Sequence, residues 1–94
     1  MARTHNPRFA ISGDGDTDSF ELGQVEHKIM CKFGDSVTGT VSVQTGIDEA
    51  HLIEIDSLTG SKVIFVKGPG ILVFSTTSYA GVNGIQIDIG EVLP

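Results

Sequence analysis

The chain has 94 residues, a length that leaves room for one compact domain and little enclosed volume. Apolar residues make up 39% and charged residues 19%, so the chain is too hydrophobic to be disordered throughout. The formal net charge of -6 disfavours general nucleic-acid binding, because a phosphate backbone would be repelled. Composition therefore indicates a small folded domain without a nucleic-acid partner.

The sequence shows no sign of export or of a membrane anchor. Cys31 is the only cysteine, which excludes an internal disulfide. The basic N-terminus is followed by glycine and aspartate instead of an apolar run, so no signal peptide is expected. No stretch approaches the roughly 20 apolar residues of a membrane span. We expect a soluble protein made in the cytoplasm, with no membrane partner.

Residues 1–19 differ in character from the rest of the chain. The segment is basic near its start and acidic between residues 14 and 18, and only residues 9–11 are apolar. Because such a segment cannot build a core of its own, we expect an extended arm that gains order by lying on a partner. The arm residues expected to bind that partner are Arg3, His5, Arg8, Phe9 and Ile11.

Residues 20–94 have the alternating pattern of β-strands. Between residues 24 and 33, an apolar row alternates with a largely charged row, which predicts a strand with one buried face. The apolar row is Val25, His27, Ile29, Cys31 and Phe33. After a turn at residues 34–36, residues 37–44 predict a second half-buried strand.

The second half of the chain continues the β pattern. Residues 51–55 predict a short strand and residues 56–61 a loop. The apolar runs 62–67 and 71–76 predict two central strands covered on both faces, joined by a corner at Gly68-Pro69-Gly70. Residues 84–92 predict a last alternating strand. Six or seven strands and no convincing helix indicate an all-β fold, an antiparallel β-sandwich or small jelly roll over residues 20–94.

Three alternating aspartates form the most suggestive local motif. Asp14, Asp16 and Asp18 are spaced as calcium ligands are in looped sites. The template then fails, since Ser19 occupies its glycine position and Val25 its terminal glutamate position. We expect a solvated acidic linker, and whether the three aspartates bind any cation stays open.

No residue pattern supports catalysis. His27 and Cys31 are four residues apart on one strand face, more than about 12 Å, so they cannot share a metal directly, although His51 could approach either one. A lone cysteine on an apolar row is usually a small buried hydrophobe. Neither a phosphate-binding glycine pattern nor a nucleophile elbow occurs. We expect no enzyme activity, no cofactor and no metal site.

The apolar runs point to association. Residues 63–66 and 71–74 present more hydrophobic surface than one small core can cover, which favours contacts within an oligomer. The alternative is that both faces of these strands pack inside the sandwich.

The stretch from Phe33 to Val92 resembles small structural proteins of tailed bacteriophages. The resemblance rests on a Gly-x-Val-x-Val-Gln strand at residues 39–44, the Gly68-Pro69-Gly70 corner, and a closing turn with Tyr79, Gly81 and Gly84. It covers about two thirds of the chain. The family has short β-sandwiches, so the resemblance implies a non-enzymatic virion component.

The resemblance implies a decoration, or cement, protein on the capsid surface, commonly a homotrimer, whose partner is the major capsid protein or another virion protein. The apolar faces would form the trimer, and the arm would lie across the shell. The alternative is a tail- or fibre-associated β-sandwich module that serves assembly or recognises a surface glycan or protein.

Overall fold

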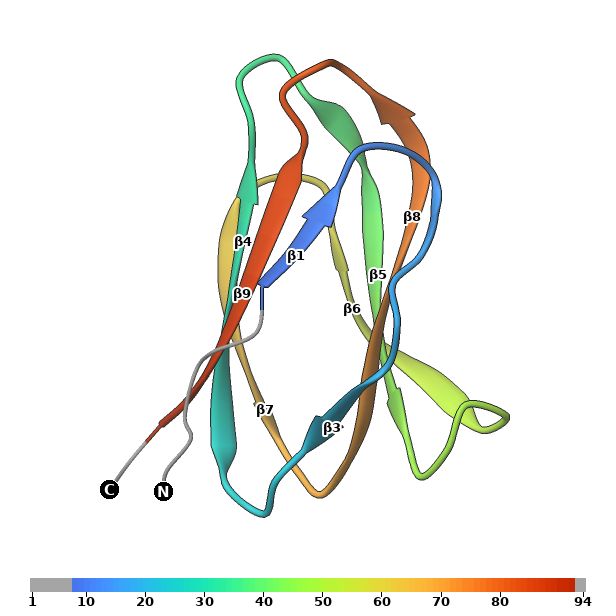
Figure 1. Cartoon of the computed structure of the whole chain (residues 1–94), viewed down its shortest axis with the longest axis vertical. Helices are drawn as coiled ribbons and strands as arrows, with labels where there is room; N and C mark the ends of the chain where they lie inside the picture. The colour runs from blue at the N-terminus through green and yellow to red at the C-terminus, as the bar shows by residue number, and fades with distance from the viewer. Residues whose placement is uncertain (1–7, 93–94) are drawn as a thin grey trace.

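The computed structural model describes residues 8–92, which form two antiparallel β-sheets packed face to face (Figure 1). The strands are β1 (Arg8–Ile11), β2 (Gly15–Asp16), β3 (Phe20–Leu22), β4 (Glu26–Phe33), β5 (Thr38–Gly46), β6 (Leu52–Leu58), β7 (Lys62–Lys67), β8 (Gly70–Ala80) and β9 (Ile85–Glu91). Sheet A has the order β1-β9-β4-β7, and sheet B has the order β2-β8-β5-β6, with β3 also paired to β8. The predicted all-β sandwich is confirmed.

The pairing of the strands is that of a jelly roll. β5 pairs with β6, β4 with β7, β8 with both β2 and β3, and β1 with β9, so the chain forms one long nested hairpin. Successive pairs of this hairpin lie in opposite sheets. If β2 and β3 are taken as one interrupted strand, this is the eight-stranded jelly-roll arrangement.

The core lies between the sheets and is made by alternate residues of the strands. In β4, for example, His27, Ile29 and Cys31 are buried, whereas the residues between them are exposed, as the alternation predicted. The fully buried side chains include Phe74, Ile29, Leu58, Leu72, Ile85, Ile87, Ile89, Val41 and Val43. At about 1.5 to 3 kcal/mol for each large apolar side chain, this burial is the main term that stabilises the sandwich.

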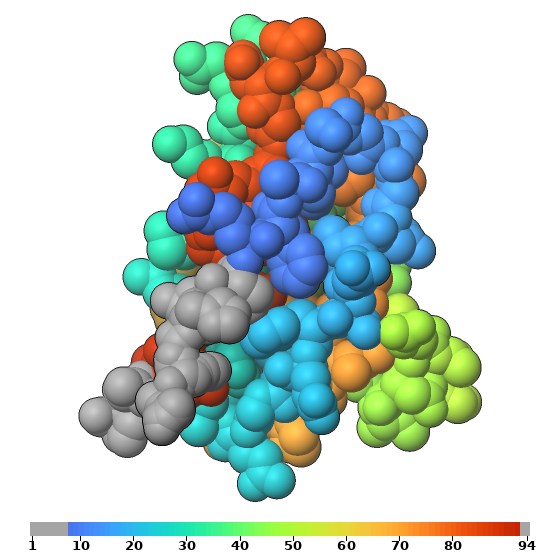
Figure 2. All heavy atoms as spheres, in the orientation of Figure 1, coloured from blue at the N-terminus to red at the C-terminus, as the bar shows by residue number. Residues whose placement is uncertain are grey.

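The sequence predicted that residues 1–19 form an extended arm. In the structure, residues 8–19 are instead part of the sandwich. β1 adds a strand to sheet A and β2 adds one to sheet B, and Figure 2 shows this segment running over one flank of the molecule between the two sheets. Thr17 continues the pairing, because its backbone N–H donates to Phe74 O (2.9 Å) and its Oγ1 accepts from Phe74 N (3.1 Å). The folded unit therefore begins by residue 8. Residues 1–7 lie outside the described residues.

Residues 8–19 join the sandwich because one edge of β8 would otherwise be unpaired. A strand edge at the core must have its backbone N–H and C=O groups paired, and a polar segment can pair them as well as an apolar one. Between Asp16 and Phe20 the partner strand carries one extra residue relative to β8, which is a β-bulge. Asp14 contributes as well, since its Oδ1 accepts a hydrogen bond from Tyr79 N at 2.8 Å.

Of the two strands expected to be central, only β8 is central. Leu72, Val73 and Phe74 in β8 are all buried, as predicted. β7 is instead the edge strand of sheet A, and its side chains alternate between the core and solvent. Val63 and Phe65 are 46% and 54% exposed. The run of apolar residues in β7 therefore supplies one row to the core and another to the surface.

The connections around these strands also refine the predicted boundaries. The predicted loop at residues 56–61 begins only after Leu58, because Asp56 and Ser57 pair with β5. The corner at residues 68–69 crosses from sheet A to sheet B. At Gly68 a Cβ would lie 2.0 Å from Gly23 O, so the close approach of two backbones requires glycine there. Residues 8–92 contain no helix long and apolar enough to cross a membrane.

Candidate functional site

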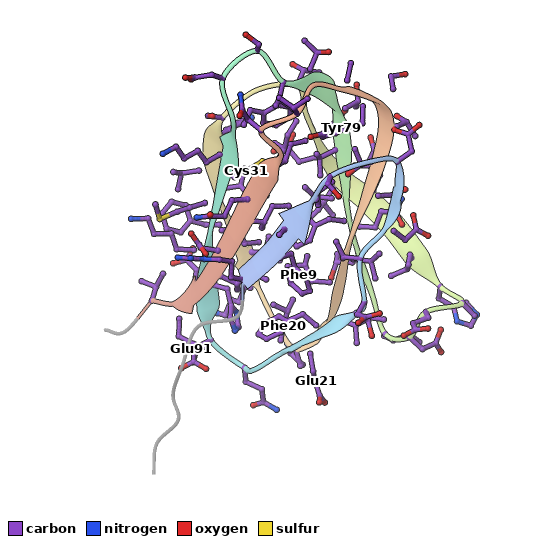
Figure 3. The ribbon with its side chains drawn as sticks, turned by 45° about the horizontal axis from the view of Figure 1, so that its top comes forward. Phe9, Phe20, Glu21, Cys31, Tyr79 and Glu91 are labelled. Atoms are coloured by element: carbon purple, nitrogen blue, oxygen red, sulfur yellow. The ribbon has the colours of Figure 1, made fainter. Side chains whose placement is uncertain are left out.

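The residues predicted to bind a partner divide into core and surface. Ile11 is 7% exposed and belongs to the hydrophobic core. Phe9 is half-buried, packs on Phe74 with ring centroids 5.9 Å apart, and points between the sheets (Figure 3). These two side chains pack into the sandwich. Arg8 is exposed, and Arg3 and His5 lie outside the described residues.

Arg8 forms an ion pair on the outer face of sheet A. Its Nε donates to Asp88 Oδ1 at 2.6 Å, and the side chains of Arg8 and Asp88 are 64% and 32% exposed. The hydrogen bond from Arg8 holds the pKa of Asp88 below its usual value of 3.8, assisted by Gln86 and opposed by partial burial. The pair contributes less than about 1 kcal/mol. This contribution is present above pH 4 or so and is lost as the pH falls through the lowered pKa.

The other half of this face carries an uncovered apolar cluster. Met30 and Val63 are cross-strand neighbours on β4 and β7, and Phe65 lies opposite Lys28. Met30 is 46% exposed, so all three apolar side chains stand well out into solvent. Lys28, Lys32 and Lys67 on the same two strands surround them, together with Glu26, which lies opposite Lys67, and Asp88 of β9, which lies opposite Met30. We call the six residues Lys28, Met30, Lys32, Val63, Phe65 and Lys67 the basic patch.

In the part of the chain that the structure describes, sheet B carries acidic charge without basic charge. Every lysine and arginine between residues 8 and 92 lies in a strand of sheet A, whereas the strands of sheet B contain only acidic charges. The end of β5, the following turn and the start of β6 carry Asp48, Glu49 and Glu54. We call residues 46–55 the acidic hairpin. In Figure 2 it projects from the body of the molecule at the lower right.

The acidic hairpin also exposes large apolar side chains. Ile47, Ile53 and Ile55 are 83%, 70% and 45% exposed. Its turn is held by Asp48 Oδ1, which accepts a hydrogen bond from Ala50 N (2.9 Å) and lies 2.7 Å from His51 Nδ1. Glu49 accepts a hydrogen bond from Ser19 at 2.8 Å, which ties the hairpin to the segment between β2 and β3. The hairpin is thus a braced projection with apolar and acidic side chains.

The residues considered for metal binding or nucleophilic chemistry are dispersed. Among residues 8–92, no three His, Cys, Asp or Glu side chains are grouped so that they could hold a metal ion. His27 and Cys31 are buried in the core, and His51 is exposed on the acidic hairpin. Burial raises the pKa of the Cys31 thiol to about 11, so the thiolate needed for nucleophilic attack is scarce near neutral pH.

Thr76 and His27 are the buried polar residues of the described chain, and Thr76 Oγ1 has no hydrogen-bond partner among the described residues. His27 is the larger of the two. It is 1% exposed, and its Nδ1 has no hydrogen-bond partner among the described residues. Its ring meets the edge of Phe20 with centroids 6.3 Å apart. Figure 3 shows Phe20 pointing into the space between the sheets. Because His27 packs against Phe20 in that space, its ring contributes to the packing of the core.

The hollows on the described surface are open grooves. One groove lies between the residue 16–19 segment and the acidic hairpin, and has a volume of about 450 Å³. Another, of about 370 Å³, lies over Gly90 between Lys28, Met30 and Val92, directly beside the basic patch. Such shallow grooves suit contact with a protein surface better than the enclosure of a small molecule.

The comparisons with known proteins add no relative. No protein-family model, no curated protein and no solved structure matches this chain.

Sequence reasoning placed Met30, Lys28 and Lys32 on the solvent face but missed the exposure of Val63 and Phe65. A signal was present, because Lys62 and Lys67 stand at the two ends of that run. Lysines at strand ends are typical of edge strands, where they discourage pairing with another sheet. No comparable signal marks the exposed isoleucines of the acidic hairpin, because no lysine flanks them in the sequence.

Proposed function

We propose that this protein is a structural component of a tailed-phage virion, a capsid decoration protein that binds and stabilises the assembled shell as a homotrimer. The observation that carries the proposal is the division of the described surface into an apolar basic patch and an apolar acidic hairpin around a filled core. Exposed apolar groups rimmed by charge are the anatomy of protein interfaces.

The fold supports this proposal at a general level. Jelly rolls occur in viral capsid domains, and also in lectins and cupins. Because a fold alone does not specify a function, the surfaces carry the greater weight. Cupins hold small molecules in enclosed pockets, whereas the grooves described for this chain are shallow and open. A binding function directed at large partners fits both observations.

Stabilisation of the shell follows from mass action. A protein that binds only the assembled shell stabilises it by about 4 kcal/mol per site at a thousandfold excess over Kd. Attachment of one oligomer at several points adds avidity, because later contacts form at a high effective concentration. In this proposal, the residues that contact the shell are Arg8, on the β1 edge, and Arg3 and His5, which precede it in the sequence.

The experiment that tests the proposal is cosedimentation with shells assembled from the major capsid protein of the phage that the proposal assigns to this chain. The full chain should sediment with assembled shells at saturable stoichiometry and should ignore unassembled capsid protein. A variant lacking residues 2–7 should lose most of this binding, and circular dichroism and thermal unfolding check that the variant still folds.

A matched control is Asp35→Lys, which changes an exposed residue in the β4–β5 turn. It should bind shells as the full chain does. Absence of shell binding by the full chain would contradict the decoration role. Binding of only a handful of copies, confined to the tail, would favour the tail- or fibre-associated alternative instead.

A further inference from the structure

The basic patch and the acidic hairpin have matching anatomy and opposite charge. Met30, Val63 and Phe65 form an apolar centre with lysines at its rim. Ile47 and Ile53 are exposed on the acidic hairpin, which also carries the carboxylates of Asp48, Glu49 and Glu54. Charge complementarity of this kind steers association and fixes the register between partners.

These two surfaces cannot meet within one molecule. The basic patch lies on the outer face of sheet A, while the acidic hairpin belongs to sheet B and projects away from sheet A (Figures 1 and 2). A patch can therefore receive a hairpin only from another molecule.

Symmetric pairing of either surface with itself is disfavoured. Two basic patches face to face would bring Lys28, Lys32 and Lys67 of both copies together, and two acidic hairpins would bring their carboxylates together. Edge-to-edge pairing of two β7 strands is opposed by Lys62 and Lys67 at the strand ends. The complementary arrangement is patch against hairpin.

We infer that copies of this chain associate head to tail, with the acidic hairpin of one copy seated on the basic patch of the next. This inference rests on the proposed function only in that the chain works as a homo-oligomer, and it names the interface. A row of copies joined head to tail has a free basic patch at one end and a free acidic hairpin at the other. The two ends meet when the rotation between neighbouring copies closes the row into a ring. The closed ring is the homotrimer proposed above.

Charge reversal tests the pairing by sedimentation velocity over a range of concentrations. Lys28→Glu with Lys32→Glu reverses the patch, and Glu49→Lys with Glu54→Lys reverses the hairpin. Each reversal should weaken association at least tenfold, because like charges then meet. The variant that carries all four changes should associate again. The Asp35→Lys control should leave association unchanged.

Mixing tests the head-to-tail geometry itself. Phe65→Ser removes the centre of the patch, and Ile53→Ser removes an apolar contact of the hairpin. Each variant alone should be monomeric, while the mixture should form a 1:1 dimer and stop there, since only one intact patch and one intact hairpin remain. Val82→Ser, at a side chain 96% exposed in the β8–β9 turn, is the matched control and should oligomerise fully.

Three results would overturn the inference. These are an oligomer insensitive to both charge reversals, reversals that the combined variant fails to rescue, and a full chain that stays monomeric at all concentrations. Circular dichroism of every variant separates loss of association from loss of folding. Shell cosedimentation is measured separately, so a monomer that still decorates shells would overturn the head-to-tail interface without removing the proposed function.

Discussion

At the scale of single residues, the burial of Ile11 places the N-terminal segment within the folded domain. Its side chain is 7% exposed and lies in the core beside the strands of sheet A. Ile11→Ala should therefore destabilise the protein by about 2 to 4 kcal/mol, through lost burial and the cavity left behind. Urea unfolding followed by circular dichroism measures this difference.

The control for Ile11 is Ile53→Ala, the same substitution at a side chain that is 70% exposed. In dilute monomeric protein this change should alter stability by no more than about 0.5 kcal/mol. Equal unfolding midpoints for the Ile11 variant and the unmodified chain would contradict the placement of β1 in the core.

Cys31 gives a second prediction at this scale. Since burial raises its pKa to about 11, the thiol should react with a chromogenic disulfide at pH 8 only as fast as the protein opens. The same thiol should react at once in urea, because an unfolded cysteine has a pKa of about 8.5. The stabilising effect of the protonated thiol is present below that value and is lost as the pH rises towards 11. A fast phase with native protein would contradict the burial of Cys31.

At the scale of elements, residues 8–19 connect the two sheets. β1 pairs with β9 in sheet A, and β2 and Thr17 pair with β8 in sheet B. Removal of residues 2–19 should expose Phe74 and leave the edges of β8 and β9 unpaired. We expect the melting temperature to fall by at least about 10 °C, given that 1 kcal/mol shifts it by about 4 to 8 °C in a domain of this size.

Asp35→Lys, at an exposed residue of the β4–β5 turn, serves as the control for that deletion and should leave the melting temperature unchanged. Thermal unfolding followed by circular dichroism compares the two. A shortened chain that lacks residues 2–19 and melts with the full chain would show that this segment adds nothing to the sandwich.

The strands that could be predicted are those whose own residues alternate. β4 and β9 each place an apolar row in the core, and the sequence pattern alone identifies those rows. β1 and β2 could not be predicted in this way, because they are short and are held by backbone hydrogen bonds to distant strands. Their pairing depends on the open edges of β8 and β9, which no local pattern reveals.

The candidate surfaces were predictable only in part for a related reason. Alternation says that Val63 and Phe65 share a face, but not whether a neighbouring element covers that face. That depends on the two-layer arrangement, which leaves the outer face of sheet A uncovered, as the 46% exposure of Met30 on the central strand β4 also shows. The charge difference between the sheets likewise becomes visible only when the strands are assigned to sheets.

At the scale of the whole molecule, the jelly-roll topology places basic and acidic side chains that are scattered along the sequence on two different surfaces. Sheet A carries the lysines and the basic patch, and sheet B carries the acidic hairpin. In the proposed arrangement, the chain contacts a neighbouring copy on each side and its N-terminal edge faces the shell. Decorated shells should therefore withstand a higher temperature than bare shells before they release their contents.

The most direct test of the central claim is particle imaging of shells assembled with and without this protein. The proposed function predicts additional density on the outer surface in many symmetry-related copies, with the size of the sandwich and with the β1 edge towards the shell. Shells that look the same with and without the protein, or density present only at the tail, would contradict the decoration role.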